Sequence, residues 1–197
     1  MITKVRVFNR FSMDHTAHFG TDSGFPFIGK PWHLISIHGD SKKFLTDKNV
    51  EALKKLGMLG CLSLEFWDIT DDKDCLESMD HHGYKYILFD KEMAKQTVDF
   101  LERRKLEAGD HVLVLHCDAG ISRSGAVAEF AAEFFGITTE TFEKENPYLR
   151  PNPFVRRLLR ESAGLAGESA FLTAAEAIRE QKLKEAVKTL IASGCFV

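Results

Sequence analysis

Short apolar segments alternate with amphipathic stretches along most of the chain. Apolar or alternating runs predict strands at about residues 5–8, 33–37, 60–67 and 111–115. Between and after them, apolar residues recur every three or four positions, as on one face of a helix. Strands that alternate with helices predict an α/β fold with a central, mostly parallel sheet flanked by helices.

Capping residues locate several of the predicted helices. Thr46 offers an N-cap to a helix that Gly57 ends, and Asp90 to a helix that runs to about Leu106. Further helices are predicted over 126–135, from about Glu140, over about 154–160, and from a capping box at 173–176. The last helix is amphipathic, and we expect its apolar positions to pack on the core or on a partner: Ile178, Leu183, Val187, Leu190 and Ile191.

Two segments lack such periodicity, and a short β-prone segment follows the second. Residues 9–33 are rich in Gly, His, Phe and Ser and predict a long ordered loop, and 71–83 are polar and acidic and predict a surface loop. Residues 84–89 predict a short strand. Four histidines fall in or near the first loop, at spacings that match no standard ligand pattern, so we expect no metal site: His15, His18, His33 and His38.

Length, charge and cysteine content limit the number of domains, the kinds of partner and the compartment. A chain of 197 residues with 44% apolar residues is long enough for one domain with a substantial core. Its net charge of −3 does not indicate a nucleic-acid partner or binding to an anionic membrane. We expect a cytoplasmic protein, because the N-terminus lacks a signal-peptide pattern and no apolar run approaches a membrane span. The four cysteines form no C-x-x-C pair, which also favours a reducing compartment: Cys61, Cys75, Cys117 and Cys195.

The chemistry concentrates in residues 116–125, His-Cys-Asp-Ala-Gly-Ile-Ser-Arg-Ser-Gly, between the last predicted strand and a helix. A strand, a glycine-containing loop and a helix N-terminus together form an anion-binding site. Cys117 stands in it as a nucleophile, Arg123 as a bidentate phosphate ligand, and Ser124 near enough to hydrogen-bond the sulfur. The residues expected to bind phosphate are Asp118, Ala119, Gly120, Ile121, Ser122, Arg123 and Ser124.

This segment resembles the active-site loop of the cysteine-based protein tyrosine and dual-specificity phosphatases. Its H-C-x-A-G-I-S-R-S variant is similar to that of bacterial and phage predicted tyrosine phosphatases, and residues 35–37 and 64–69 extend the resemblance, which covers about 33–160. It implies a fold of the phosphotyrosine protein phosphatase II type. It also implies a phosphocysteine intermediate on Cys117, an Arg123 phosphate clamp, an upstream Asp as general acid, and no metal or other cofactor. We expect one phosphatase domain over 1–197, with a C-terminal helical extension at about 165–197.

The general acid is the open assignment. Members of the family carry this Asp some thirty residues before the Cys, and no residue here matches that spacing. Asp68 ends a predicted strand and is favoured, although it lies further upstream than usual. Asp90 lies closer but has a plainer function as a helix cap, and Asp71 and Asp72 are the remaining candidates.

The favoured function is hydrolysis of a phosphorylated protein or of a small phosphomonoester. The alternatives are a pseudophosphatase that binds phosphotyrosine without turnover, a rhodanese-like sulfurtransferase, and a Cys117 that is only a buried core residue. We expect the Asp118 side chain to point outward, and its charge, in a loop without Lys, argues against phosphoinositide substrates. The preference for phosphotyrosine or phosphoserine depends on the depth of the cleft. This preference and the oligomeric state do not follow from the sequence.

Overall fold

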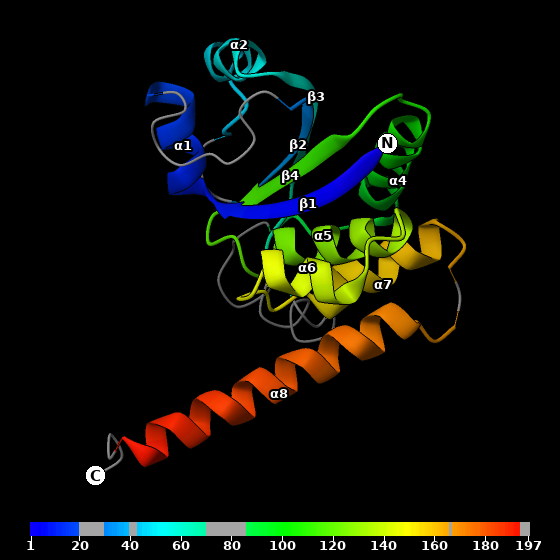
Figure 1. Cartoon of the computed structure of the whole chain (residues 1–197). Helices are drawn as coiled ribbons and strands as arrows, with labels where there is room; N and C mark the ends of the chain where they lie inside the picture. The colour runs from blue at the N-terminus through cyan, green and yellow to red at the C-terminus, as the bar shows by residue number, and fades with distance from the viewer. Residues whose placement is uncertain (20–29, 40–42, 70–85, 166, 194–197) are drawn as a thin grey trace.

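The computed structural model describes residues 1–19, 30–39, 43–69, 86–165 and 167–193 (Figure 1). In these residues, four strands form one sheet in the order β1-β4-β2-β3, and every pair is parallel. The strands are β1 (Ile2–Asn9), β2 (Trp32–His38), β3 (Met58–Glu65) and β4 (His111–Cys117). The predicted α/β class and the mostly parallel sheet are confirmed.

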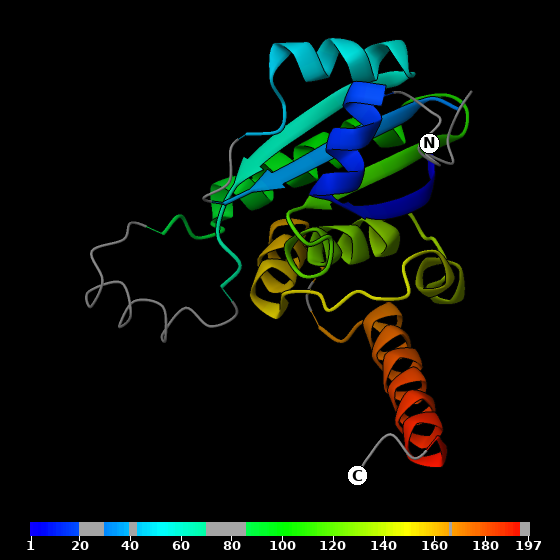
Figure 2. The ribbon, with the colours of Figure 1, turned by 90° about the vertical axis from the view of Figure 1, so that its left-hand side faces the viewer.

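Helices cover both faces of the sheet (Figures 1 and 2). One face carries α1 (Arg10–Phe19) and α2 (Asp47–Lys55). The other face carries a layer of four helices: α4 (Lys91–Lys105), α5 (Arg123–Phe134), α6 (Thr139–Glu145) and α7 (Pro153–Ser162). The last helix, α8 (Ala170–Ala192), begins beside this layer and extends away from it (Figure 1).

The two central strands are buried on both faces, and their alternating side chains divide into two cores. Val112 and Val114 of β4 pack with Met13 of α1 and Leu53 of α2. The intervening β4 residues pack with β2, α4, α5 and α7 in the larger core. Because every β4 side chain is buried, the strand appears in the sequence as a continuous apolar run instead of an alternating one.

Capping residues and apolar periodicity in the sequence predicted most of the helices correctly. Thr46 caps α2 by accepting a hydrogen bond from the Asn49 N–H, and Asp90 caps α4 by accepting one from the Met93 N–H. Gly57 follows α2 with a φ of 93°, a conformation that favours glycine. The helices predicted over 126–135, from about Glu140 and over about 154–160 correspond to α5, α6 and α7.

Three predictions of local structure were wrong. Residues 10–19 form α1 instead of loop, because Met13 is completely buried in the smaller core and Asn9 caps the first turn through the Ser12 N–H. Helix α8 begins at Ala170, with Ser169 as its cap, so the predicted capping box at Thr173 lies inside the helix. Residues 86–89 form no strand. Residues 20–29, the predicted loop at 71–83, and Cys75 and Cys195 lie outside the described residues.

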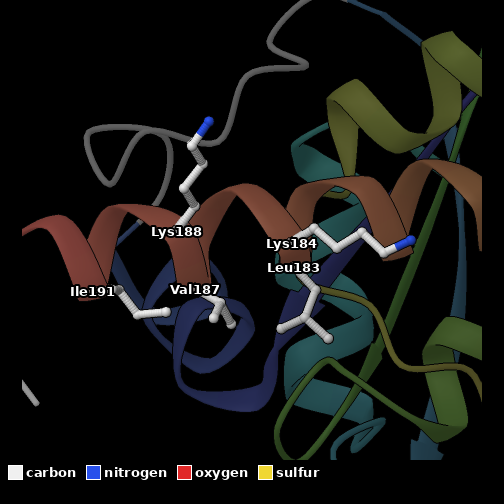
Figure 3. A pocket seen from close by; sticks show the side chains of 5 residues that line it. All are labelled: Leu183, Lys184, Val187, Lys188 and Ile191. Carbon is white, nitrogen blue, oxygen red and sulfur yellow. The ribbon is translucent and has the colours of Figure 1, made fainter.

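The two halves of α8 have different surroundings. In the first half, Arg179 binds Glu129 of α5 at 2.7 Å and Glu143 of α6 at 2.6 Å, and both carboxylates are buried. In the second half, Leu183, Val187 and Ile191 are exposed and point from the same side of the helix (Figure 3). Of the two alternatives expected from the sequence, packing on the core is therefore wrong for these three residues, and packing on a partner stays a prediction. No helix in the described part of the chain combines the length and low charge needed to cross a bilayer.

Candidate active site

The loop between β4 and α5 is bound to the body of the protein on its outer side. Cys117 is the last residue of β4, and Arg123 is the first residue of α5. Carbonyl groups of the loop accept hydrogen bonds from outside it: Asp118 O from Arg10 N at 3.1 Å, and Ile121 O from Arg150 N at 3.2 Å. These two hydrogen bonds hold the loop against the start of α1 and the segment before α7.

Gly120 is required where the loop passes β1. Its φ is +70°, and a Cβ there would stand 2.5 Å from the Phe8 carbonyl oxygen. Both the left-handed backbone and the close approach exclude a side chain. The Gly120 N–H in turn donates a hydrogen bond to Cys117 Sγ over 3.2 Å. Steric constraints therefore require glycine at position 120, and its N–H group lies within hydrogen-bond distance of the Cys117 sulfur.

Cys117 is 2% exposed and meets a second donor. The hydroxyl of Ser124, on the first turn of α5, donates to Cys117 Sγ over 3.1 Å, as the spacing predicted. Two donors thus converge on one sulfur. This arrangement differs from that of a cysteine that only fills a core.

The N-terminus of α5 adds further donors. Its N-cap residue, Ser122, makes no side-chain hydrogen bond to the helix. The N–H groups of the first turn have no carbonyl partner inside the helix, and they carry the positive end of its dipole. A helix end in this state beside the Cys117 sulfur is suited to bind an anion.

Arg123 is held in position by two oxygens. Its Nη1 donates to the Phe66 carbonyl over 3.1 Å, and its Nη2 donates to Asp118 Oδ2 over 2.6 Å. A Cβ on Gly39 would stand 3.0 Å from Nη1, so the absent side chain leaves room for the guanidinium. The expectation that the Asp118 side chain points outward was wrong, because the positive charge five residues later attracts its carboxylate back to the loop.

Asp68 is the candidate acid that contacts the loop. Its Oδ1 accepts a hydrogen bond from Ser122 Oγ at 2.7 Å and another from Asn152 Nδ2 at 3.0 Å. Asp90, in contrast, caps α4, because its Oδ1 accepts a hydrogen bond from the Met93 N–H in the first turn of that helix. Asp71 and Asp72 lie outside the described residues.

Asn152 is a positioning residue that the sequence analysis missed. Its amide nitrogen donates to Asp68 and, over 2.7 Å, to the Ile69 carbonyl, while its Oδ1 accepts from two N–H groups of α7. It thereby connects the segment after β3 to α7. The signal was present locally, because an Asn before Pro153 is a strong N-cap with Pro at the first helical position.

His116 faces away from the sulfur of its neighbour. Side chains alternate along a strand, so the His116 ring lies on the α1 side of the sheet, where it meets the Phe44 ring edge-on at a centroid distance of 4.6 Å. Burial, reinforced by the positive charge of Arg10, lowers the pKa of His116 to about 4. The ring is uncharged near neutral pH and belongs to the packing below the loop.

Comparisons with known proteins give matches at the level of structure. No protein-family model matches the chain, and comparison with curated proteins finds no significant match. Among solved structures, PTPMT1 in complex with PI(5)P is 14% identical over 84% of this chain and 96% of that one, with a TM-score of 0.45. A mutant form of Tk-PTP is 17% identical over 83% and 93% of the two chains, with a TM-score of 0.46.

A third solved structure is the human tyrosine phosphatase-like serine/threonine/tyrosine-interacting protein. It is 19% identical over 68% of this chain and 78% of that one, with a TM-score of 0.35. These proteins are of the kind that the sequence motif resembles. At such identities and TM-scores, the similarity assigns no activity to this chain.

Proposed function

We propose that the protein is a cysteine-dependent phosphatase that hydrolyses phosphomonoesters, either on proteins or on small molecules. The observation that carries this proposal is the convergence of Gly120 N–H and Ser124 Oγ on the buried Cys117 sulfur, beside the uncapped start of α5. A sulfur in an anion-binding site is suited to attack a phosphoryl group whose oxygens the same donors hold.

In the proposed reaction, Cys117 Sγ forms a bond to phosphorus while the bond from phosphorus to the ester oxygen breaks. Loop N–H groups and the Arg123 guanidinium stabilise the negative charge on the three equatorial oxygens. Water then cleaves the S–P bond of the phosphocysteine, phosphate leaves, and the Ser124 hydroxyl stabilises the departing thiolate.

We assign the general acid to Asp68. Among the described residues, both hydrogen bonds to the Asp68 carboxylate go to Oδ1. We therefore propose that Oδ2 carries the proton. Asp68 gives this proton to the leaving oxygen in the first step and takes one from water in the second. We also place the reaction in a reducing cytoplasm, where Cys117 stays a thiol, as it is in the structure.

The nucleophile is tested with p-nitrophenyl phosphate, a phosphotyrosine peptide, a phosphoserine peptide and a phosphoinositide. Cys117→Ser is expected to lower kcat by about 10⁴-fold or more, because the nucleophile is lost while the anion site remains. Cys61→Ser, on β3 and away from the loop, is the matched control and should keep the wild-type rate. An equally active Cys117→Ser variant would exclude the proposal.

Two other outcomes distinguish the alternatives. Tight phosphopeptide binding by the wild type without hydrolysis would identify a pseudophosphatase. Turnover of thiosulfate, without turnover of phosphate esters, would identify a sulfurtransferase.

The acid is tested through the leaving group. Asp68→Asn should lower kcat by about 10²-fold or more on a tyrosine phosphate. The loss should be smaller on p-nitrophenyl phosphate, whose phenolate leaves without protonation. Asp90→Asn is the matched control and should keep both the wild-type rate and the fold, because an Asn side chain can accept the hydrogen bond from the Met93 N–H in the same way. An equal loss on both substrates would mean that Asp68 only positions the loop, and no loss would move the acid to Asp71 or Asp72.

A further inference from the structure

Three metal-ligand side chains meet at the end of the sheet opposite Cys117. His33 is the second residue of β2, His111 is the first residue of β4, and Glu107 lies in the turn between α4 and β4. Their ligand atoms form a nearly equilateral triangle. His33 Nε2 lies 2.7 Å from Glu107 Oε2, His111 Nδ1 lies 2.9 Å from the same oxygen, and the two nitrogens are 3.1 Å apart.

The size of this triangle suits a metal ion. Nitrogen and carboxylate ligands bind first-row divalent ions at roughly 2.1 Å, which places neighbouring ligands of an octahedral ion about 3.0 Å apart. Two histidines and one carboxylate on one face of an octahedron form a known donor set for such ions. Both histidines are buried, whereas the Glu107 side chain is 29% exposed, so one side remains open for entry and for water ligands.

The end of α4 and the Arg104 side chain both act on the charge of Glu107. Helix α4 ends at Lys105, two residues before Glu107, and the C-terminal end of a helix is the negative end of its dipole. Arg104 Nη1 binds Glu107 Oε1 at 3.0 Å, which leaves Oε2 to the two histidines.

We propose that His33, Glu107 and His111 bind a divalent first-row transition-metal ion that keeps water at its remaining positions, with Zn²⁺ and Co²⁺ as the probes of the site. The site lies six residues from Cys117 along β4, or about 20 Å at the rise of a strand. The ion would connect β2, β4 and the end of α4, and it takes no part in the proposed phosphatase chemistry. No metal site was expected from the sequence, because His33 was considered only with its neighbouring histidines and lies 78 positions from His111.

The test is zinc binding to the full-length Cys117→Ser protein, which removes the active-site thiol as a competing ligand. We expect one equivalent of Zn²⁺ by calorimetry and by metal analysis after dialysis. His111→Ala and Glu107→Gln in the same background should weaken binding by more than the roughly 10–100-fold that loss of a second-shell residue costs. Glu102→Gln, on the exposed side of α4, is the matched control and should bind as the parent does.

Cobalt provides a readout that does not depend on the variants folding. Bound to the parent protein, Co²⁺ should show the visible bands of nitrogen and oxygen coordination without the intense near-ultraviolet band of a thiolate ligand. Absence of zinc binding, a thiolate band with cobalt, or unchanged affinity in folded Glu107→Gln would each overturn the proposal. In that case the triangle is a hydrogen-bond network around Glu107.

Discussion

The two ends of β4 carry opposite kinds of chemistry. At the carboxyl end, Cys117 Sγ accepts hydrogen bonds from the Gly120 N–H and the Ser124 hydroxyl, beside the uncapped start of α5. At the amino end, His111 stands beside His33 and the carboxylate of Glu107, which together present lone pairs. In our proposals, the first end receives an anion and the second binds a cation.

The polarity of a parallel sheet explains this difference. All four strands point the same way, so the helix that follows β4 begins at the carboxyl end and the helix that precedes it ends at the amino end. Helix α5 therefore directs its positive end to Cys117, and α4 directs its negative end to the Glu107 turn. The contribution of the backbone to the charge at each end thus follows from the direction of the chain.

The largest expected effect concerns the carboxyl end. Arg123→Lys should lower kcat/KM for p-nitrophenyl phosphate by about 10³-fold, or roughly 4 kcal/mol, because an ammonium cannot donate two parallel hydrogen bonds to a phosphoryl group. Arg157→Lys, an exposed residue of α7, is the control and should be unchanged. A loss below tenfold would show that the helix end and the loop amides bind the anion without the guanidinium.

The next effect concerns stability and tests whether His116 is buried as an uncharged ring. Its pKa is about 4 in the folded protein and 6.5 without the fold, so between these values the unfolded chain takes up a proton that the folded chain does not. The unfolding free energy should fall as the pH drops from 6.5 to 4, by roughly 3 kcal/mol for this residue.

The measurement is urea unfolding at several pH values. His116→Phe keeps a ring beside Phe44 and removes the titration, so its stability should decline less over this range than that of the wild type. Parallel pH profiles for the two proteins would mean that the His116 ring is accessible to protons in the folded state.

Ligand-induced stabilisation compares the two ends directly. At a concentration 100 times the Kd, either ligand should stabilise the fold by about 2.7 kcal/mol, which thermal unfolding detects. In the Cys117→Ser background, Arg123→Lys should lose the shift with inorganic phosphate and keep the shift with Zn²⁺. Glu107→Gln should do the reverse. Loss of both shifts in one variant would show that β4 couples its two ends.

The smallest expected effect concerns the carboxylate that binds the phosphate clamp. Asp118→Asn removes a negative charge from the loop and frees Arg123 Nη2, so the KM for p-nitrophenyl phosphate should fall up to about tenfold, or roughly 1.4 kcal/mol. A higher KM in this variant would show instead that Asp118 holds the guanidinium in its working orientation.

Features that depend on residues close together in the sequence were predicted, and features that depend on distant residues were missed. Helices α2 and α4 were predicted because Thr46 and Asp90 cap them within three residues. Helix α1 was missed because the burial of Met13 stabilises it, and burial depends on the sheet that α1 covers. The direction of the Asp118 side chain was missed because it depends on where the first turn of α5 places Arg123.

The sequence by itself determined the strand, the loop and the helix around Cys117, because Cys117, Arg123 and Ser124 lie within eight consecutive residues. Only the tertiary structure decided which distant groups join them or stand opposite. Asp68 reaches Ser122 across 54 positions, and His33 reaches His111 across 78. The physical reason is that hydrogen bonds and metal ligands require approach within about 3 Å, and at such separations only the packing of the sheet brings these atoms together.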